Sequence, residues 1–302
     1  MNALRFLPGP SRLWRRLIPA ASVVLLAAGC ASRTTPTDAL RHSLTFHASF
    51  DHGLDADFAV GARGLSNAPS LKERDAAVAG LPAGGQIQLA TGEGVFGNAL
   101  KFTRNESPLL FYRAAGNAGY RTTNWSGTVS FWLRVDPLAQ LAPGYCDPLQ
   151  ITPRAWNDAA FFLEFEKRTN DIPFRLGIYP NLPVWNPTNR RWEDMTPAEK
   201  PLLTVPNPPF SGSRWTHVVF TFENFNTGRD DGVAQLYLDG VAAGSIPARR
   251  QTFTWDEAQA LMMMGVGYVG LWDELSVFNR SLTPEEVGVL HRLPGGVQTL
   301  HP

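Results

Sequence analysis

Two glutamates, Glu164 and Glu166, have the spacing that two catalytic carboxylates on one strand would have. Hydrolysis of a glycosidic bond needs two carboxyl groups roughly 5 to 10 Å apart, one of them acting as a general acid. Alternate residues of a strand share a face, so the run LEFE at 163–166 places both acids on one side. The same pattern suits two solvated acids beside Lys167 and Arg168 on an exposed strand. We therefore expect no catalysis at this pair.

Other catalytic motifs are missing from the sequence. It contains no G-x-S-x-G nucleophile turn, no H-E-x-x-H zinc motif and no glycine loop of the phosphate-binding type. The six histidines lack zinc spacing, and we expect His217 to be an ordinary strand residue. The sequence therefore predicts no catalytic residues and a protein that is not an enzyme.

Tryptophans are the other residues that could bind a ligand. Nine are present, and four of them lie in or beside expected loops, where an indole flanked by polar groups can stack on the C–H face of a sugar. These four candidate ligand-binding residues are Trp156, Trp185, Trp192 and Trp255. Each could instead anchor its own loop on the body of the protein, and this alternative stays open.

The first 30 residues have the pattern of a bacterial export signal. Four arginines precede a 12-residue apolar stretch at 17–28, which is too short for a stop-transfer helix. The run LAAGC at 26–30 resembles the lipobox of bacterial lipoproteins, in which the cysteine, here Cys30, receives a lipid. A plain secretory signal with an incidental cysteine is the alternative. The sequence thus predicts a signal peptide at 1–29 and a membrane anchor through the lipid alone.

The residues after Cys30 predict how the anchor joins the folded part. Residues 31–40 are polar and rich in helix breakers, so we expect a flexible tether at 30–42 and one domain at 43–302. By resemblance to bacterial lipoprotein sorting, Ala31 rather than Asp directly after the cysteine implies the outer membrane. The second cysteine, Cys146, would be a lone thiol and is expected as a small packing residue.

From residue 43 onward the sequence predicts an all-β domain. Short runs with apolar residues at every second position recur between turn-forming residues, as in half-buried antiparallel strands. Clear examples are 43–50, 127–135, 159–167, 174–179, 215–223, 233–238 and 268–278. Asp239-Gly240 predicts a two-residue hairpin turn. Two helices are expected, after Thr254 and after Thr283, because each threonine has a glutamate three residues on, as in a capping box.

Two long segments interrupt the strand pattern. Residues 54–85 are small and rich in Gly and Ala, and residues 180–209 contain eight prolines with Trp185 and Trp192. Loops of this length are usually functional or disordered rather than part of the scaffold.

Six segments resemble, in order, the laminin G-like domains of the concanavalin A-like lectin/glucanase superfamily. They are FHASFDHG at 46–53, GVFGNALKF at 94–102, GTVSFWLRVDP at 127–137, RWTHVVFTFE at 214–223, AQLYLDG at 234–240 and VGLWDELSVFNRSLTPEEV at 269–287. The resemblance implies a jelly-roll β-sandwich of two antiparallel sheets. It implies little about activity, because this fold hosts lectins, adhesion modules, glycosidases and spacers.

The same resemblance implies a structural calcium ion. In similar domains oxygen ligands at the end of the first strand and in the closing strand hold a hard cation, and the matching positions here are Asp51 and Asp273. A sandwich brings the first and last strands together, and burying two carboxylates without a cation is costly. Alternatively, Asp51 only caps a turn before Gly53, and Asp273 accepts backbone hydrogen bonds.

The charge balance narrows the possible partners. Beyond residue 29 the chain holds 23 basic and 27 acidic residues without a concentrated basic face, which argues against nucleic acid and anionic membranes as partners. We expect an envelope-anchored lipoprotein whose domain binds a glycan or a surface protein. The alternatives are a glycoside hydrolase of the glucanase branch that uses Glu164 or Glu166, and a structural envelope protein without a ligand.

Overall fold

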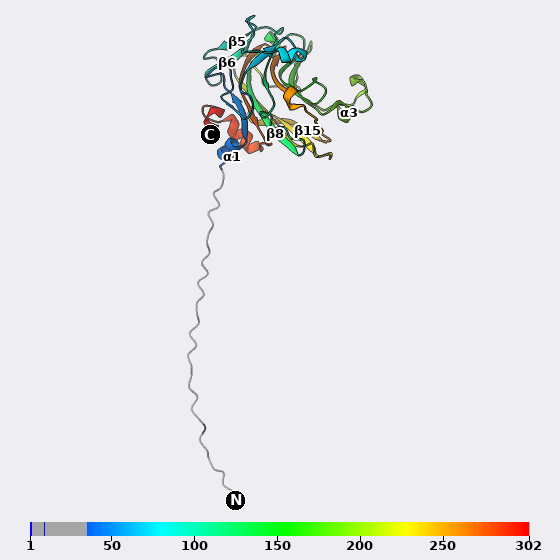
Figure 1. Cartoon of the computed structure of the whole chain (residues 1–302). Coiled ribbons are helices and arrows are strands. Elements are labelled where there is room, and N and C mark those ends of the chain that lie inside the picture. Colours follow the sequence, from blue (N-terminus) through cyan, green and yellow to red (C-terminus); the bar gives the residue numbers. More distant parts are fainter. Residues whose placement is uncertain (2–8, 10–34, 302) are drawn as a thin grey trace. The chain divides into compact units, whose positions relative to one another are not determined.

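The computed structural model describes residues 35–301, together with residues 1 and 9. The expected signal peptide and Cys30 therefore lie outside the described residues, apart from those two positions. Residues 35–301 form one compact unit, a β-sandwich with short helices (Figure 1). No helix in this described part combines the length and the hydropathy that crossing a membrane would require.

One layer of the sandwich is a nine-stranded antiparallel sheet. Its main path runs β15-β14-β13-β8-β17-β1-β2, while β6 pairs with β17 and β5 with β6. Its strands are β1 (Leu44–Ala48), β2 (Phe58–Ala59), β5 (Ile87–Ala90), β6 (Ala99–Phe102), β8 (Trp125–Arg134), β13 (Thr216–Phe225), β14 (Gly232–Leu238), β15 (Val241–Arg249) and β17 (Gly270–Phe278). The first long strand, β1, thus lies beside the last, β17.

The second layer is an eight-stranded antiparallel sheet in the order β12-β11-β10-β9-β16-β7-β3-β4. Its strands are β3 (Ser66–Ala68), β4 (Val78–Ala79), β7 (Leu109–Arg113), β9 (Gly144–Thr152), β10 (Ala160–Lys167), β11 (Phe174–Tyr179), β12 (Leu202–Val205) and β16 (Leu261–Val266). Together the two sheets confirm the predicted all-β sandwich.

The main core lies between the sheets. Alternate residues of each central strand point inward, for example Val218 and Phe220 of β13 against Phe161 of β10. Aromatic rings fill much of this space, and Trp125 has its ring 5.2 Å from that of Phe161. Cys146 is buried in the same cluster as a free thiol, as expected.

Helices and 3-10 turns connect the strands. They are α1 (Pro36–Ser43), α2 (Pro137–Gln140), α3 (Leu182–Trp185), α4 (Pro284–His291), η1 (Leu71–Ala76), η2 (Trp192–Asp194), η3 (Glu257–Gln259) and η4 (Val297–Leu300). The helix predicted after Thr283 is confirmed with its capping box, because the N–H of Glu286 donates to the Thr283 hydroxyl at 3.2 Å. The prediction of a helix after Thr254 is wrong. Asp256 caps the single turn η3, and β16 begins directly afterwards.

The predicted boundary between tether and domain also differs from the structure. Residues 36–42, assigned to the flexible tether, belong to helix α1. Thr35 and Asp38 form a capping box, and the side chain of Leu40 is buried beneath the C-terminal helices. Local capping and the burial of one leucine therefore make this segment part of the compact unit.

The Asp239-Gly240 hairpin is confirmed. Both residues have positive φ, 51° and 78°, as a type I′ turn requires, and they join β14 to β15 with Leu238 opposite Val241. The two outer faces of the sandwich differ in their cover. Helices α1, α4 and η4 bury an apolar cluster on the nine-stranded sheet, whereas η1 covers only the β3, β7 and β16 side of the other sheet.

Candidate functional site

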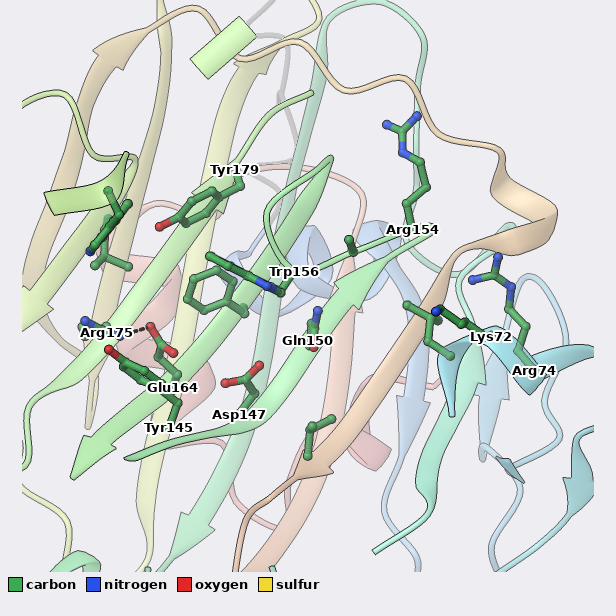
Figure 2. Close-up of a pocket in the computed structure, with 16 residues that line it drawn as sticks. Lys72, Arg74, Tyr145, Asp147, Gln150, Arg154, Trp156, Glu164, Arg175 and Tyr179 are labelled. Carbon is green, nitrogen blue, oxygen red and sulfur yellow. Dashed lines mark ion pairs between the residues drawn. The ribbon is translucent and has the colours of Figure 1, made fainter. Parts of the chain in front are cut away.

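A cavity of about 740 Å³ opens on the outer face of the eight-stranded sheet (Figure 2). Its floor consists of the outward side chains of β9, β10 and β11. In β10 the residues Phe161, Leu163 and Phe165 point into the core, so Phe162 and Glu164 point outward. The period of the strand therefore creates a polar and aromatic floor directly above an apolar core.

The two long insertions supply the walls of the cavity. Leu71, Lys72 and Arg74 come from the first insertion, and Trp192 and Leu202 come from the second. Both segments are thus ordered parts of the structure around the cavity. Their position around the cavity favours the interpretation that these loops are functional.

An ion-pair network lies on the floor. Arg175 of β11 pairs in register with Glu164 of β10, and its guanidinium contacts the Glu164 carboxylate at 2.5 Å and that of Glu166 at 2.7 Å. Burial raises the pKa of Glu164 in spite of the Arg175 charge. At Glu166 burial is outweighed by the hydrogen bond from Arg168 and the charge of Arg175, which lower its pKa. The two glutamates are therefore not equivalent.

Asp147 is a free carboxyl group beside this network. A β-bulge in β9 places it opposite Glu164, and the carboxyl group has no hydrogen-bond or ion-pair partner among residues 35–301. Burial and the nearby Glu164 charge raise its pKa well above the usual range. Gln150, 7% exposed, also lines the cavity, and its amide makes no hydrogen bond within the described part of the chain. Such unpaired groups are costly unless a ligand or water pairs with them.

Aromatic rings form the upper part of the cavity. Trp156 is 52% exposed, and its ring is supported edge-on by Phe162 at 6.3 Å and Tyr179 at 5.8 Å. Trp192 stacks on Tyr179 from the other side at 6.3 Å. Figure 2 shows the Trp156 ring above Asp147 and Gln150. The arrangement offers a flat apolar surface next to unpaired polar groups.

The four predicted tryptophans separate into two groups. Trp156 and Trp192 line the cavity. Trp185 does not line it: its indole N–H donates to the Asn157 carbonyl at 2.9 Å and so ties down the adjacent loop. The prediction for Trp255 is wrong, because this side chain is only 7% exposed and packs in the core against Trp125. A loop tryptophan can thus fill the core when the loop crosses the open end of the sandwich.

Asp51 and Asp273 contact the same loop, residues 94–98. The Asp51 carboxylate accepts the N–H of Asn98 at 2.6 Å, and the Asp273 carboxylate accepts the N–H of Val95 at 2.8 Å. Burial, Glu274 and Asp51 raise the pKa of Asp273 to about 9. A buried carboxylate that has no cationic side chain as partner in the described residues fits the donor set for calcium.

Two carboxylates are too few ligands for a complete metal centre. Within residues 35–301 no group of three or more His, Cys, Asp or Glu side chains is arranged to hold a metal ion. A calcium ion at Asp51 and Asp273 would therefore need backbone carbonyls or water as further ligands. The calcium site stays a prediction.

Several cavity residues were missed at the sequence level. Asp147, Gln150 and Arg175 come from two strands and meet through the pairing of β9, β10 and β11. One signal was available: Arg175 is a single charge within the otherwise apolar run FRLGIY at 174–179. A charge there needs a partner in the fold, but the sequence does not name it.

The fold and the site define a sandwich of lectin and glucanase type. A family model described as the concanavalin A-like lectin/glucanases superfamily matches residues 112–288, and the chain belongs to this superfamily. This confirms the resemblance seen in the sequence. No curated protein matches the sequence.

Two solved structures are similar to this chain at low sequence identity. One is domain 4 of AbnA, a GH43 extracellular arabinanase from Geobacillus stearothermophilus, in complex with arabinotriose, at 19% identity, TM-score 0.48, covering 82% of this chain and 97% of that one. Another is the binding domain of botulinum neurotoxin DC in complex with SialylT, at 11% identity, TM-score 0.52, covering 84% and 52%. The chain spans about half the length of the neurotoxin binding domain that it matches.

Proposed function

We propose that this domain is a non-catalytic carbohydrate-binding module and that the cavity of the eight-stranded sheet is its binding site. The observation that carries the proposal is the exposed ring of Trp156 beside the unpaired polar groups Asp147 and Gln150. The likeness to the neurotoxin binding domain extends to the fold alone, so the cavity and not the neighbour supports the function.

The chemistry of the cavity matches that of a sugar. A pyranose ring has an apolar C–H face and a rim of hydroxyl groups, so one side can stack on an indole while the rim forms hydrogen bonds. Trp156 supplies the ring. Asp147 and Gln150 supply acceptors and a donor at the adjacent floor, and the Glu164–Arg175 ion pair holds further oxygen and nitrogen atoms in a fixed geometry.

The proposal includes an envelope location. Cys30 would carry the lipid and anchor the module to a membrane, with the outer membrane favoured by Ala31. The anchor would hold the module at the envelope, where glycans or surface proteins are its partners. Incorporation of labelled palmitate into the wild-type chain and its loss in Cys30→Ala would test this part. Equal labelling of both chains would contradict it.

The structural calcium ion forms a separate proposal. Asp51 and Asp273 would hold it at the loop 94–98, where β1 and β17 meet the rest of the sheet. Its role would be to compensate the buried charge of Asp273 and to fix the loop. It would not touch the ligand, because neither aspartate lines the cavity.

The function is tested by screening the full chain on a glycan array and comparing it with Trp156→Ala. We expect binding to at least one glycan class and a loss of 10-fold or more in the variant, because stacking on the exposed ring is removed. Leu138→Ala, an exposed substitution outside the cavity, serves as the matched control and should bind as the wild type does. Absence of all binding by a folded protein would favour the structural envelope role or a surface protein as partner.

A second candidate is a glycoside hydrolase, because two carboxyl groups with raised pKa values, Asp147 and Glu164, share the cavity. Asp147 would be the acid, and Glu164 the nucleophile or base. Glu166 is unsuited, since it is bound to Arg175 and Arg168. Turnover on a polysaccharide panel that Glu164→Gln and Asp147→Asn each abolish, with binding retained, would favour this candidate over the non-catalytic module. Turnover that survives both substitutions would exclude this site.

A further inference from the structure

The charged residues of the cavity are unevenly distributed. Four basic side chains and two acidic ones line it, although the sequence beyond residue 29 holds more acid than base. Three of the basic residues, Lys72, Arg74 and Arg154, come from η1 and from the end of β9, on the right of the view in Figure 2. The acidic residues Asp147 and Glu164 lie at the other end. The cavity therefore has a basic end and an acidic end.

The arginines at the basic end are held in place by neutral partners and by one aspartate. Arg74 donates through Nε to the Gln259 side chain at 2.6 Å and through Nη1 to the Pro153 carbonyl at 2.9 Å. Arg154 contacts Asp158 through Nε at 3.2 Å and Asn181 through Nη2 at 3.1 Å. Each guanidinium keeps one terminal nitrogen without a partner among residues 35–301. The two groups are thus fixed in position and still have donors for a ligand.

Lys72 adds an exposed charge to these two groups. It is exposed on η1 and has no hydrogen-bond or ion-pair partner within the described part of the chain. Among residues 35–301, Asp158 alone forms an ion pair with one of these three side chains. Charge-assisted hydrogen bonds from guanidinium and ammonium groups to carboxylate or sulfate oxygens are shorter and stronger than those to neutral oxygens.

The acidic end of the cavity favours different ligand groups from the basic end. Asp147 has no cationic partner of its own, and the Glu164 carboxylate is already bound by Arg175. An anionic group placed there would find no free cationic donor, whereas sugar hydroxyl groups could pair with the Asp147 and Gln150 side chains. The two ends therefore favour different parts of one ligand.

We propose that the ligand is an anionic oligosaccharide whose carboxylate or sulfate groups bind at the end lined by Lys72, Arg74 and Arg154, while a neighbouring sugar stacks on Trp156 with its hydroxyl groups toward Asp147. This inference rests on the proposed carbohydrate-binding function. It adds the chemical class of the ligand and its orientation along the cavity. A uronic acid and a sulfated sugar share the anionic chemistry, so the experiment includes both.

The test compares three sets of oligosaccharides by calorimetry on the full chain at low salt: oligogalacturonates, the same oligomers after reduction of their carboxyl groups, and sulfated galactan oligomers. We expect at least one anionic set to bind 10-fold or more tightly than the reduced, neutral set. Raising the salt concentration should weaken only the anionic ligands, because screening reduces charge interactions. The anionic set that binds identifies the source of the charge.

Lys72→Glu is the decisive variant. It should lower the affinity for the anionic set at least 10-fold and leave the neutral set unchanged, since it reverses an exposed charge without removing any packed atom. Lys101→Glu reverses a charge on β6 of the other sheet, where Lys101 lies 3.4 Å from Glu93, and should leave the affinity for both sets unchanged. Circular dichroism confirms that both variants are folded.

Carbohydrate binding and the preference for an anionic ligand are refuted by different results. Equal affinity for the anionic and neutral sets, or an anionic affinity unchanged by Lys72→Glu, overturns the anionic ligand and leaves carbohydrate binding standing. Lack of binding by all three sets and on the wider glycan array overturns both.

Discussion

The outer faces of the two sheets differ in how far other elements cover them. On the nine-stranded sheet, α1, α4 and η4 bury an apolar cluster that includes Tyr237, Phe278 and Leu290. On the eight-stranded sheet, strands β9, β10 and β11 stay open and present Glu164 and Arg175 to the cavity. The main core between the sheets is shared by both layers, so the outer faces can differ. One outer face then adds stability, and the other is free to bind.

Ionisable groups show the same contrast. On the covered face, His217 is buried, its Nε2 is 2.8 Å from the Ser130 hydroxyl, and its ring stacks on Trp132 at 4.5 Å. Burial and then the charge of His291 lower the pKa of His217 to about 3, so it stays neutral. On the open face, Glu164 and Arg175 are also largely buried, at 7% and 8% exposed, but they pair with each other at 2.5 Å. Burial thus disfavours the charged form of His217 and of Glu164 alike, but only Glu164 has an opposite charge beside it.

The largest effect on stability is expected from the covered face. Leu290→Ala should lower the free energy of unfolding by about 3 kcal/mol, because it leaves a cavity beneath α4 while alanine suits the helix itself. Denaturation in urea measures the change. Leu138→Ala, 74% exposed, is the matched control and should stay within about 0.5 kcal/mol of the wild type. Equal effects of the two substitutions would show that α4 does not stabilise the sandwich.

Calcium provides the next test, since its predicted site joins β1 and β17 of the covered sheet. At one hundred times its dissociation constant, the ion should raise the free energy of unfolding by about 2.7 kcal/mol, and a chelator should remove this gain. Asp51→Asn should abolish the dependence, while the exposed Asp171→Asn should keep it. A melting midpoint that is the same in calcium and in chelator would remove the proposal.

His217 predicts a pH dependence of stability. The unfolded chain takes up a proton near pH 6.5, whereas the folded protein does not until about pH 3, so stability is lost as the pH falls through this window. The loss between pH 8 and pH 5.5 should be about 1.4 kcal/mol from this residue. His217→Gln should flatten that part of the profile, and the exposed His52→Gln should not. Parallel profiles for the wild type and His217→Gln would contradict a neutral buried histidine.

The smallest effect on stability is expected in the open cavity. Trp156→Ala removes a ring that is half exposed, so the free energy of unfolding should fall by only about 1 kcal/mol while glycan binding is lost. Thermal unfolding and the array measurement on one preparation separate the two readouts. A large loss of stability would mean that Trp156 anchors its loop and would undo the contrast between the two faces.

Local patterns predicted much of the scaffold. Period-2 runs located the central strands, Asp239-Gly240 located a hairpin, and Thr283 with Glu286 located α4. These features depend on interactions within a few residues of each other, so they can be read from the chain directly. The helix after Thr254 failed because Asp256 competes as the cap and β16 follows at once.

Long-range packing decided the rest. The sequence by itself determined the β-sandwich, the positions of the two long insertions and the presence of tryptophans in or beside the loops. Only the tertiary structure decided that Trp255 fills the core and that Trp156 faces a cavity. It also brought Asp147 opposite Glu164 through a bulge, and Glu164 opposite Arg175 through register. Strand pairing joins residues across loops of any length, and a one-residue shift in register would turn each side chain to the other face.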